Sequence, residues 1–370
     1  MATTYQAGRR IQGTSTDFGT DGAGIPAISG GWKELGRHVI GTASSEVFVA
    51  SLPDKRYYMV LYEDKGEASA NARLLRYNSD SGSNYSNRVS SNGAADTTST
   101  SQPQHNGWNN NNTLPQFNVW YIANLAGKEK MLLSQGVYQD TAGAGTTPDR
   151  VEYVGKWANT ADAINRIGVI QNAGTHSTGT TMTVLGWDPT DTHTTNFWEE
   201  LASVTLGSAN DLIDSGTITA KKYLWIQIYN TAKPSGGNSY VYYNDVTSGG
   251  THSGRSNTNG ANPTNQSSQS DYQLTSTNGS IINHDVSSSG TTTGMFTNIF
   301  VINNASNAKL SIIHSVSGWT NAGAGVAPAR FECVGKWTNT SAQITEIDYM
   351  QQTTSVNFPS GSFIKVWGSN

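Results

Sequence analysis

The chain has 370 residues and a formal net charge of −4, with 35% hydrophobic and only 14% charged residues. This balance argues against a general nucleic-acid surface, and a single cysteine, Cys333, excludes an internal disulfide framework and a cysteine-based metal cluster. No apolar run approaches the roughly 20 residues of a membrane span, so we expect no membrane insertion.

Aromatic residues argue that this polar chain folds. The sequence contains 10 Trp, 16 Tyr and 9 Phe, too many for a disordered polypeptide. Polar, glycine-rich turns separate short aromatic and β-branched runs, and this pattern is typical of an all-β protein.

The first 30 residues differ from the rest of the chain. They hold few apolar residues and the pair Arg9 and Arg10, and they lack the apolar segment of a secretory signal. We therefore expect the protein to fold in a cytoplasm. We interpret residues 1–30 as an N-terminal arm that becomes ordered on a neighbouring subunit, with Arg9 and Arg10 as attachment candidates; the alternative is a loose tail.

Seven apolar blocks in the first half are expected to be strands, because each alternates or is bounded by turn residues. In Arg150–Trp157 the alternation is strict, so Val151 and Tyr153 face one side of the sheet, and Arg150 and Glu152 face the other. The expected strands are Tyr57–Tyr62, Arg73–Tyr77, Phe117–Ala123, Lys130–Val137, Arg150–Trp157, Ala163–Ile170 and Met182–Leu185.

The most informative stretch occurs twice. Residues 142–167 and 322–347 share 15 identities over 26 positions at an offset of 180, including Ala-Gly-Ala-Gly, an Arg-x-Glu and a Gly-Lys-Trp. Further blocks match at offsets of 166, 179 and 182, so the second copy has gained residues mainly within Tyr243–Met295.

The repeat sets the domain organisation. We predict an N-terminal arm (1–30), a first β-sandwich module (31–186), a short linker (187–196) and a second β-sandwich module (197–370). The fold class is therefore all-β, with two tandem, internally repeated, jelly-roll-like sandwiches.

The sequence does not favour catalysis. The repeated glycines precede a strand rather than a helix, which is wrong for a phosphate loop. Glu152 and Glu332 each follow an Arg on the same strand face, which favours structural ion pairs over an acid–base pair. Asp188, Asp191 and His193 fit no metal-loop spacing. We therefore predict no enzyme activity, no metal and no cofactor.

Aromatic residues in polar surroundings are the better candidates for an interface or a ligand site. Trp108 lies in an Asn-rich loop, Tyr242 and Tyr243 precede Asn-Asp, and Trp319 precedes Thr-Asn. Tryptophan and tyrosine are enriched at protein interfaces. The same residues beside Asn and Asp also hold sugars, so a host surface glycan is an open alternative.

The recurring Ala-Gly-Ala-Gly-x-x-Pro-x-Arg-x-Glu-x-x-Gly-Lys-Trp-x-Asn-Thr, with a closing Val-x-Gly, resembles a group of virion structural proteins of marine tailed viruses, of decoration or fibre type. The resemblance covers residues 32–370. It implies a non-enzymatic part of a bacteriophage particle and transfers no site.

The sequence thus predicts a viral structural protein on the outer surface of the virion, a capsid decoration protein or tail fibre that acts by protein–protein assembly. Expected partners are viral capsid or tail proteins and further copies of the chain, with a trimer as the expected oligomer. Two alternatives stay open: a tail protein that binds a host receptor or glycan, and a capsid shell protein with two jelly rolls.

Overall fold

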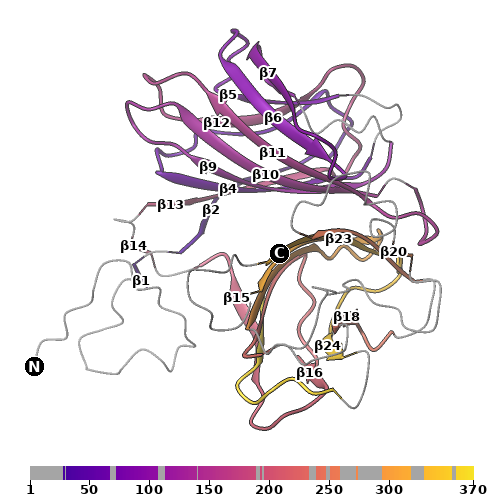
Figure 1. Ribbon diagram of the computed structural model, residues 1–370. Coiled ribbons are helices and arrows are strands. Elements are labelled where there is room, and N and C mark those ends of the chain that lie inside the picture. Colours follow the sequence, from indigo (N-terminus) through magenta and orange to yellow (C-terminus); the bar gives the residue numbers. More distant parts are fainter. Residues whose placement is uncertain are drawn as a thin grey trace, which may run out of the picture.

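The computed structural model consists of strands and connecting segments in all the residues that it describes (Figure 1). Among these residues, no helix is long and apolar enough to cross a membrane. The described residues are 28–29, 31–66, 72–106, 113–139, 141–188, 192–193, 196–232, 239–246, 251–258, 272–273, 294–317, 329–351 and 356–370.

The first half forms a sandwich of a large and a small antiparallel sheet, which we call module 1. The large sheet has eight strands in the order β2-β13-β4-β9-β10-β11-β6-β7, and the small sheet has four in the order β3-β12-β5-β8. Their bounds are β2 Lys33–Val39, β3 Glu46–Ala50, β4 Tyr57–Asp64, β5 Arg73–Tyr77, β6 Tyr85–Ser91, β7 Thr97–Gln102, β8 His105–Asn106, β9 Gln116–Ala123, β10 Lys130–Tyr138, β11 Asp149–Trp157, β12 Arg166–Gln171 and β13 Thr181–Trp187.

The second half, module 2, repeats this arrangement. Its large sheet has the order β15-β25-β17-β21-β22-β23-β19-β20, and its small sheet has the order β16-β24-β18. The bounds are β15 Glu199–Thr205, β16 Leu212–Asp214, β17 Tyr223–Asn230, β18 Ser239–Tyr243, β19 His252–Thr258, β20 Tyr272–Gln273, β21 Met295–Ile302, β22 Lys309–Ser317, β23 Ala329–Trp337, β24 Ile347–Gln351 and β25 Phe363–Ser369.

Apart from β8, each strand of module 1 has a counterpart among the described strands of module 2, so the fold is two tandem β-sandwiches, as the sequence predicts. All seven expected strands of the first half are present, and β5 has the expected bounds. The strands β2, β3, β6, β7 and β8 were missed. Four of them carry few apolar residues in a row, whereas β3 has an apolar run in only five residues. The enlarged segment Tyr243–Met295 is also more than loop, since it contains β19 and β20, the counterparts of β6 and β7.

The segment between the modules also contains a strand. β14 (Thr192–His193) pairs with β1 (Ile28–Ser29), so the end of the N-terminal arm lies beside the connection between modules. This places residues 28–29 on the chain's own linker. The rest of the arm, including Arg9 and Arg10, lies outside the described residues.

Each sandwich encloses its own hydrophobic core between the large and small sheets. Trp157 and Trp337, the tryptophans that end the two copies of the repeated strand, are fully buried in these cores. The indole Nε1 of Trp157 donates to Asp80 at 2.7 Å, whereas Nε1 of Trp337 has no hydrogen-bond partner among the described residues. The repeat therefore conserves the apolar packing of the indole but not its polar contact.

Module 1 buries a charged cluster beside its core. Asp64 and Arg73 are both fully buried, and Arg73 Nε donates to Asp64 Oδ2 at 2.5 Å. The same carboxylate accepts hydrogen bonds from the Tyr62 hydroxyl and the Gly66 amide at 2.9 Å each, and it lies 3.6 Å from His176 Nδ1. These donors offset the free-energy cost of burying the charged carboxylate of Asp64.

Module 2 fills the corresponding space with neutral groups. The internal offsets of 166, 180 and 182 place a different, uncharged residue opposite each member of the cluster. Asn230 Nδ2 donates to the Tyr349 hydroxyl at 2.9 Å, and the Tyr349 and Phe358 rings stack at 4.6 Å between centroids. The counterparts are Asn230 for Asp64, Ser239 for Arg73, Tyr349 for Val169 and Phe358 for His176.

Candidate interaction surfaces

The sequence candidates Tyr242 and Tyr243 are not surface residues. Both lie on β18 in the small sheet of module 2 and are buried, with exposed fractions of 1% and 0%. The Tyr243 hydroxyl bonds the Ser311 hydroxyl at 3.1 Å inside the core. The expectation that these two tyrosines contact a partner or a ligand is therefore corrected: Tyr243 lies in the core between the two sheets, and Tyr242, on the other face of the same strand, is covered as well. The sequence alone could not show this, because two adjacent aromatic residues in a strand normally face opposite sides.

The other candidates fall elsewhere. Trp108 and Trp319 lie outside the described residues, as do Arg9 and Arg10. The interface or glycan roles expected for Trp108 and Trp319, and the attachment role expected for the arginines, stay predictions.

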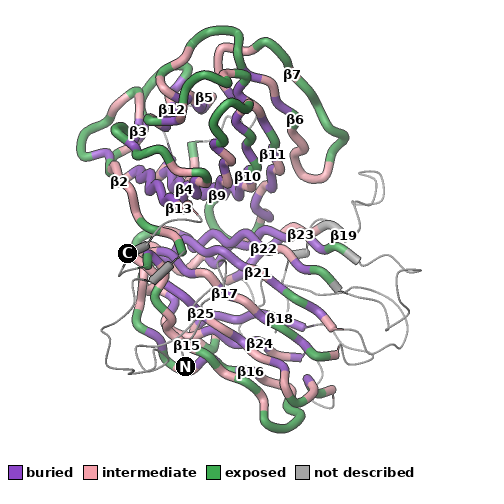
Figure 2. The backbone as a smooth tube through the Cα atoms, turned by 90° about the vertical axis from the view of Figure 1, so that its left-hand side faces the viewer, coloured by how far each residue is buried: buried purple, intermediate pink, exposed green. Residues whose placement is uncertain are grey.

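A third hydrophobic cluster joins the two modules. It lies between the outer faces of the two large sheets, that is, the faces turned away from the small sheets, and Figure 2 shows the strands at this junction as buried. The apolar character of both faces of β9 and β10 is the sequence signal for such a second contact. The buried residues of the cluster are Met59, Leu61, Phe117, Val119, Val137, Leu185, Phe197, Tyr223, Phe300, Ile302, Leu310, Ile312 and Val334.

The outer face of each large sheet has two halves. The hairpin half lies near the β9–β10 turn in module 1 and near the β21–β22 turn in module 2, and the far half lies toward the other strand ends. The hairpin halves hold Tyr121, Ala123, Met131, Leu133 and Val154 in module 1, and Phe300, Ile302, Leu310, Ile312 and Val334 in module 2. The far halves hold Leu61, Phe117, Val119 and Val137 in module 1, and Gln227, Phe296, Asn298 and Val316 in module 2.

The contact between modules joins unlike halves. The far half of module 1 and the hairpin half of module 2 are the parts that bury each other. In the hairpin half of module 1, Met131, Leu133 and Val154 are exposed instead, with Leu133 at 49%, whereas Tyr121 packs against the edge of the cluster. In the far half of module 2, Phe296 and Val316 are exposed, with Phe296 at 37%. Because the two modules share one topology, each buried half has an exposed counterpart on the other module.

Polar contacts surround the apolar contact. Lys222 Nζ lies 3.1 Å from Glu63 Oε2 and donates to the Thr181 hydroxyl at 2.9 Å. At the opposite side, Lys336 Nζ donates to the carbonyl oxygens of Gln139 and Thr141 at 3.0 and 2.8 Å. These groups fix the relative placement of the two sheets, since each charge is partly or fully removed from water there.

The repeated Arg-x-Glu pairs meet at this junction. Arg150 Nε lies 2.8 Å from Glu152 Oε1, and Arg330 Nε lies 3.3 Å from Glu332 Oε1, as expected for pairs on one strand face. Arg150 also reaches across to module 2, where its Nη1 donates to the Glu332 carbonyl oxygen at 3.1 Å. The sequence missed this crossing, which depends on how the modules dock.

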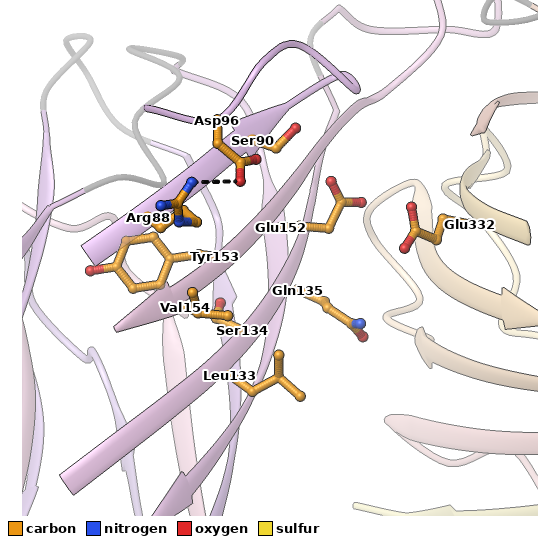
Figure 3. Close-up of a pocket in the computed structure, with 10 residues that line it drawn as sticks. All are labelled: Arg88, Ser90, Asp96, Leu133, Ser134, Gln135, Glu152, Tyr153, Val154 and Glu332. Atoms are coloured by element: carbon orange, nitrogen blue, oxygen red, sulfur yellow. Dashed lines mark hydrogen bonds and ion pairs between the residues drawn. The ribbon is translucent and has the colours of Figure 1, made fainter. Parts of the chain in front are cut away.

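Glu152 and Glu332 line a pocket of about 260 Å³ between the modules (Figure 3). Burial raises the pKa of Glu152 to about 7, the Glu332 charge adds to the rise, and Arg150 opposes it. Two facing acids in a pocket are the part of the described structure nearest to an acid–base site. Each acid is ion-paired with an arginine, however, and the pocket wall also contains the apolar side chains of Leu133 and Val154.

A second acidic group lies on the small sheet of module 2. Asp214, Glu346 and Asp348 offer carboxylate oxygens within 4.8 Å of one another, and Asp245 interacts with the latter two. Burial and the neighbouring carboxyl groups raise the pKa of Asp348 to about 7. Oxygen ligands of this kind are those that a hard cation prefers, although acidic groups often cluster without one.

The same positions in module 1 carry no acid. Offsets of 166 and 180 put Phe48, Ser79, Arg166 and Gly168 there. The Arg166 guanidinium lies 4.1 Å from the centroid of the Phe48 ring. Arg166 also pairs with Glu46 at 2.8 Å, so the acidic group is a feature of the small sheet of module 2 that module 1 does not repeat.

Comparisons with known proteins identify no relative of this chain. No family model matches the chain, and no curated protein matches it. Domains LG4-5 of the mouse laminin alpha1 chain are similar over 92% of this chain and 91% of that chain, with 9% identity and a TM-score of 0.19. The LG1-3 region of the laminin alpha2 chain is similar over 92% and 62%, with 8% identity and a TM-score of 0.19. Likenesses at this TM-score carry no argument about fold or function.

Proposed function

We propose that this chain is a structural protein of a virus particle, located on its outer surface, where it acts by protein–protein assembly and not by catalysis. The observation that carries the proposal is the outer face of the two large sheets. Each face carries a group of apolar residues, and on each face only part of that group is covered within the chain. Exposed apolar surface of this extent marks an interaction site in a soluble protein.

The described acidic groups support a non-enzymatic role. Glu152 and Glu332 are each ion-paired with an arginine on the same strand face, which is the arrangement of structural ion pairs in a sheet. The viral part of the proposal rests on the repeated sequence motif, which resembles virion structural proteins of marine tailed viruses. Capsid or tail proteins are the expected partners, and a decoration protein or a fibre is the expected form.

Locating the protein on a particle tests the proposal. Antibodies raised against the purified chain should label the outside of intact virus particles in immunogold electron micrographs, and peptides of the chain should be found in purified particles. Particles that encode the sequence but contain no peptide of it would refute a structural role. Labelling only after the particles are broken would refute the outer location.

A recognition role predicts a different result. A protein that binds a host glycan should give a signal on a glycan array, and Trp108→Ala should remove that signal. This alternative has lost part of its original support, because Tyr242 and Tyr243 are buried in the core. An array signal that depends on Trp108 would favour recognition over assembly.

A further inference from the structure

The contact between the modules is heterologous. If it joined the same half of each large sheet, both modules would bury equivalent residues and leave equivalent residues exposed. Instead, Val137 of module 1 is buried while its counterpart Val316 is exposed, and Leu310 of module 2 is buried while its counterpart Met131 is exposed. The hairpin half of module 1 and the far half of module 2 therefore lack the cover that their counterparts have in the contact between the modules.

We propose that a second copy of this chain covers these two halves, with the hairpin half of module 1 in one copy packing against the far half of module 2 in the next. This inference rests on the proposed assembly function and names its partner. The partner is argued from the existing contact within the chain. That contact shows that a far half and a hairpin half of this sheet can bury each other, and a second copy supplies the missing half on each side.

The exposed halves keep much of the apolar character of the buried ones. In the hairpin half, Met131, Leu133 and Val154 occupy the places of Leu310, Ile312 and Val334. In the far half, Phe296 and Val316 occupy the places of Phe117 and Val137. Register extends this half into an apolar row across four neighbouring strands, which consists of Phe363, Tyr229, Phe296 and Val316.

One polar contact can also be repeated between copies. Within the chain, Arg150 of the far half reaches Glu332, with Nη1 and Oε2 3.8 Å apart. The counterpart of Arg150 is Arg330, whose side chain is 61% exposed and also pairs with Glu332. The counterpart of Glu332 is Glu152. A second copy would bring Arg330 of one chain to Glu152 of the next, so the repeated Arg-x-Glu serves both contacts.

Other polar contacts are not repeated, and the association should therefore be weaker than the contact within the chain. Arg255 Nη1 lies 3.3 Å from Asp149 Oδ1 between the modules, but Ala329 stands at the counterpart of Asp149. Tyr229 likewise stands in place of Glu63, and Gln227 and Asn298 replace Leu61 and Val119. Lower apolar area and fewer ion pairs predict an assembly that depends on protein concentration. A heterologous contact closes into a ring or continues as a filament.

Sedimentation velocity of the full chain over a range of concentrations tests the proposal. The chain should self-associate, and Leu133→Glu or Phe296→Glu should each weaken the association about 30- to 100-fold, because each puts an unpaired charge into an apolar contact. Both side chains are substantially exposed in the single copy, so the variants should fold, and circular dichroism checks this. Phe48→Asp is the matched control. It replaces an exposed aromatic residue on the small sheet of module 1 with the aspartate that module 2 carries at the same position, Asp214, and it should leave association unchanged.

Mixing the two variants gives the decisive result. The Leu133→Glu variant keeps an intact far half and the Phe296→Glu variant keeps an intact hairpin half, so the mixture should form a dimer that neither variant forms alone. A chain that stays monomeric at all concentrations would overturn the inference, and so would association unaffected by either variant. Neither result bears on the labelling of virus particles, which tests the proposed function independently.

Discussion

The buried charge of module 1 gives a quantitative prediction, because module 2 shows what the same fold does without it. The change Arg73→Ser installs the residue of module 2 at this position and removes the cation that lies 2.5 Å from Asp64. Asp64 would then be a buried carboxylate with its hydroxyl and amide donors but without its arginine. Breaking a buried ion pair in this way costs about 3–5 kcal/mol.

Exchange of the whole cluster should cost far less than the single change. The variant that carries all four residues of module 2 removes the charge together with its partners and fills the space with a tyrosine. Replacing a buried ionic group by a well-packed neutral set is close to neutral in stability. We expect the fourfold variant to recover to within about 2 kcal/mol of the natural protein. The changes are Asp64→Asn, Arg73→Ser, Val169→Tyr and His176→Phe.

Urea denaturation followed by tryptophan fluorescence measures both effects, since the Trp120 ring stacks on Tyr62 at 5.3 Å between centroids. The pH dependence supplies a second test. Burial raises the pKa of Asp64, but the hydrogen bond from His176 and the charge of Arg73 outweigh it and hold this pKa well below its usual range. The natural protein should lose this part of its stability as pH falls below about 4, and the fourfold variant should not.

Two outcomes would refute this reasoning. A single Arg73→Ser change that costs less than about 1 kcal/mol would mean that the arginine does not compensate the buried charge. A fourfold variant as unstable as the single one would mean that the neutral packing of module 2 does not transfer between the copies.

Three further predictions concern the sheets. Burial and nearby carboxyls raise the pKa of Asp348 to about 7, so the charged form of Asp348 destabilises the folded protein, and this cost grows between about pH 4 and pH 7. Asp348→Asn should therefore raise the melting temperature at pH 8 but not at pH 4, and equal shifts at the two pH values would contradict this. Trp157→Phe should cost about 1 kcal/mol more than Trp337→Phe in urea denaturation, because only Trp157 donates a hydrogen bond to a carboxylate; equal costs would count against it. Lys222→Met should lower the free energy of unfolding by about 1–2 kcal/mol by removing a partner of the buried Glu63, and no change would argue against that role.

The sequence alone was sufficient for the class of fold and its duplication. Strict alternation in Arg150–Trp157 predicted which side chains face the core, and Val151 and Tyr153 do lie there. Such patterns are readable because a strand presents successive side chains to opposite faces, whatever the rest of the chain does. The polar strands β6 and β7 lack this signal: β7 has no buried side chain, and β6 buries Tyr85 together with the polar Asn87, so neither shows an apolar alternation.

The tertiary structure alone decided which surfaces are free. Both copies carry apolar residues on the outer faces of their large sheets, but only the docking of one module on the other determines that Val137 is buried and Val316 is exposed. The same docking gives the repeated Arg-x-Glu two environments, since Arg150 is enclosed between the modules and Arg330 is exposed. Equivalent residues differ in this way because the two large sheets of one chain make a single contact. That contact joins the far half of module 1 to the hairpin half of module 2, so the hairpin half of module 1 and the far half of module 2 lie outside it.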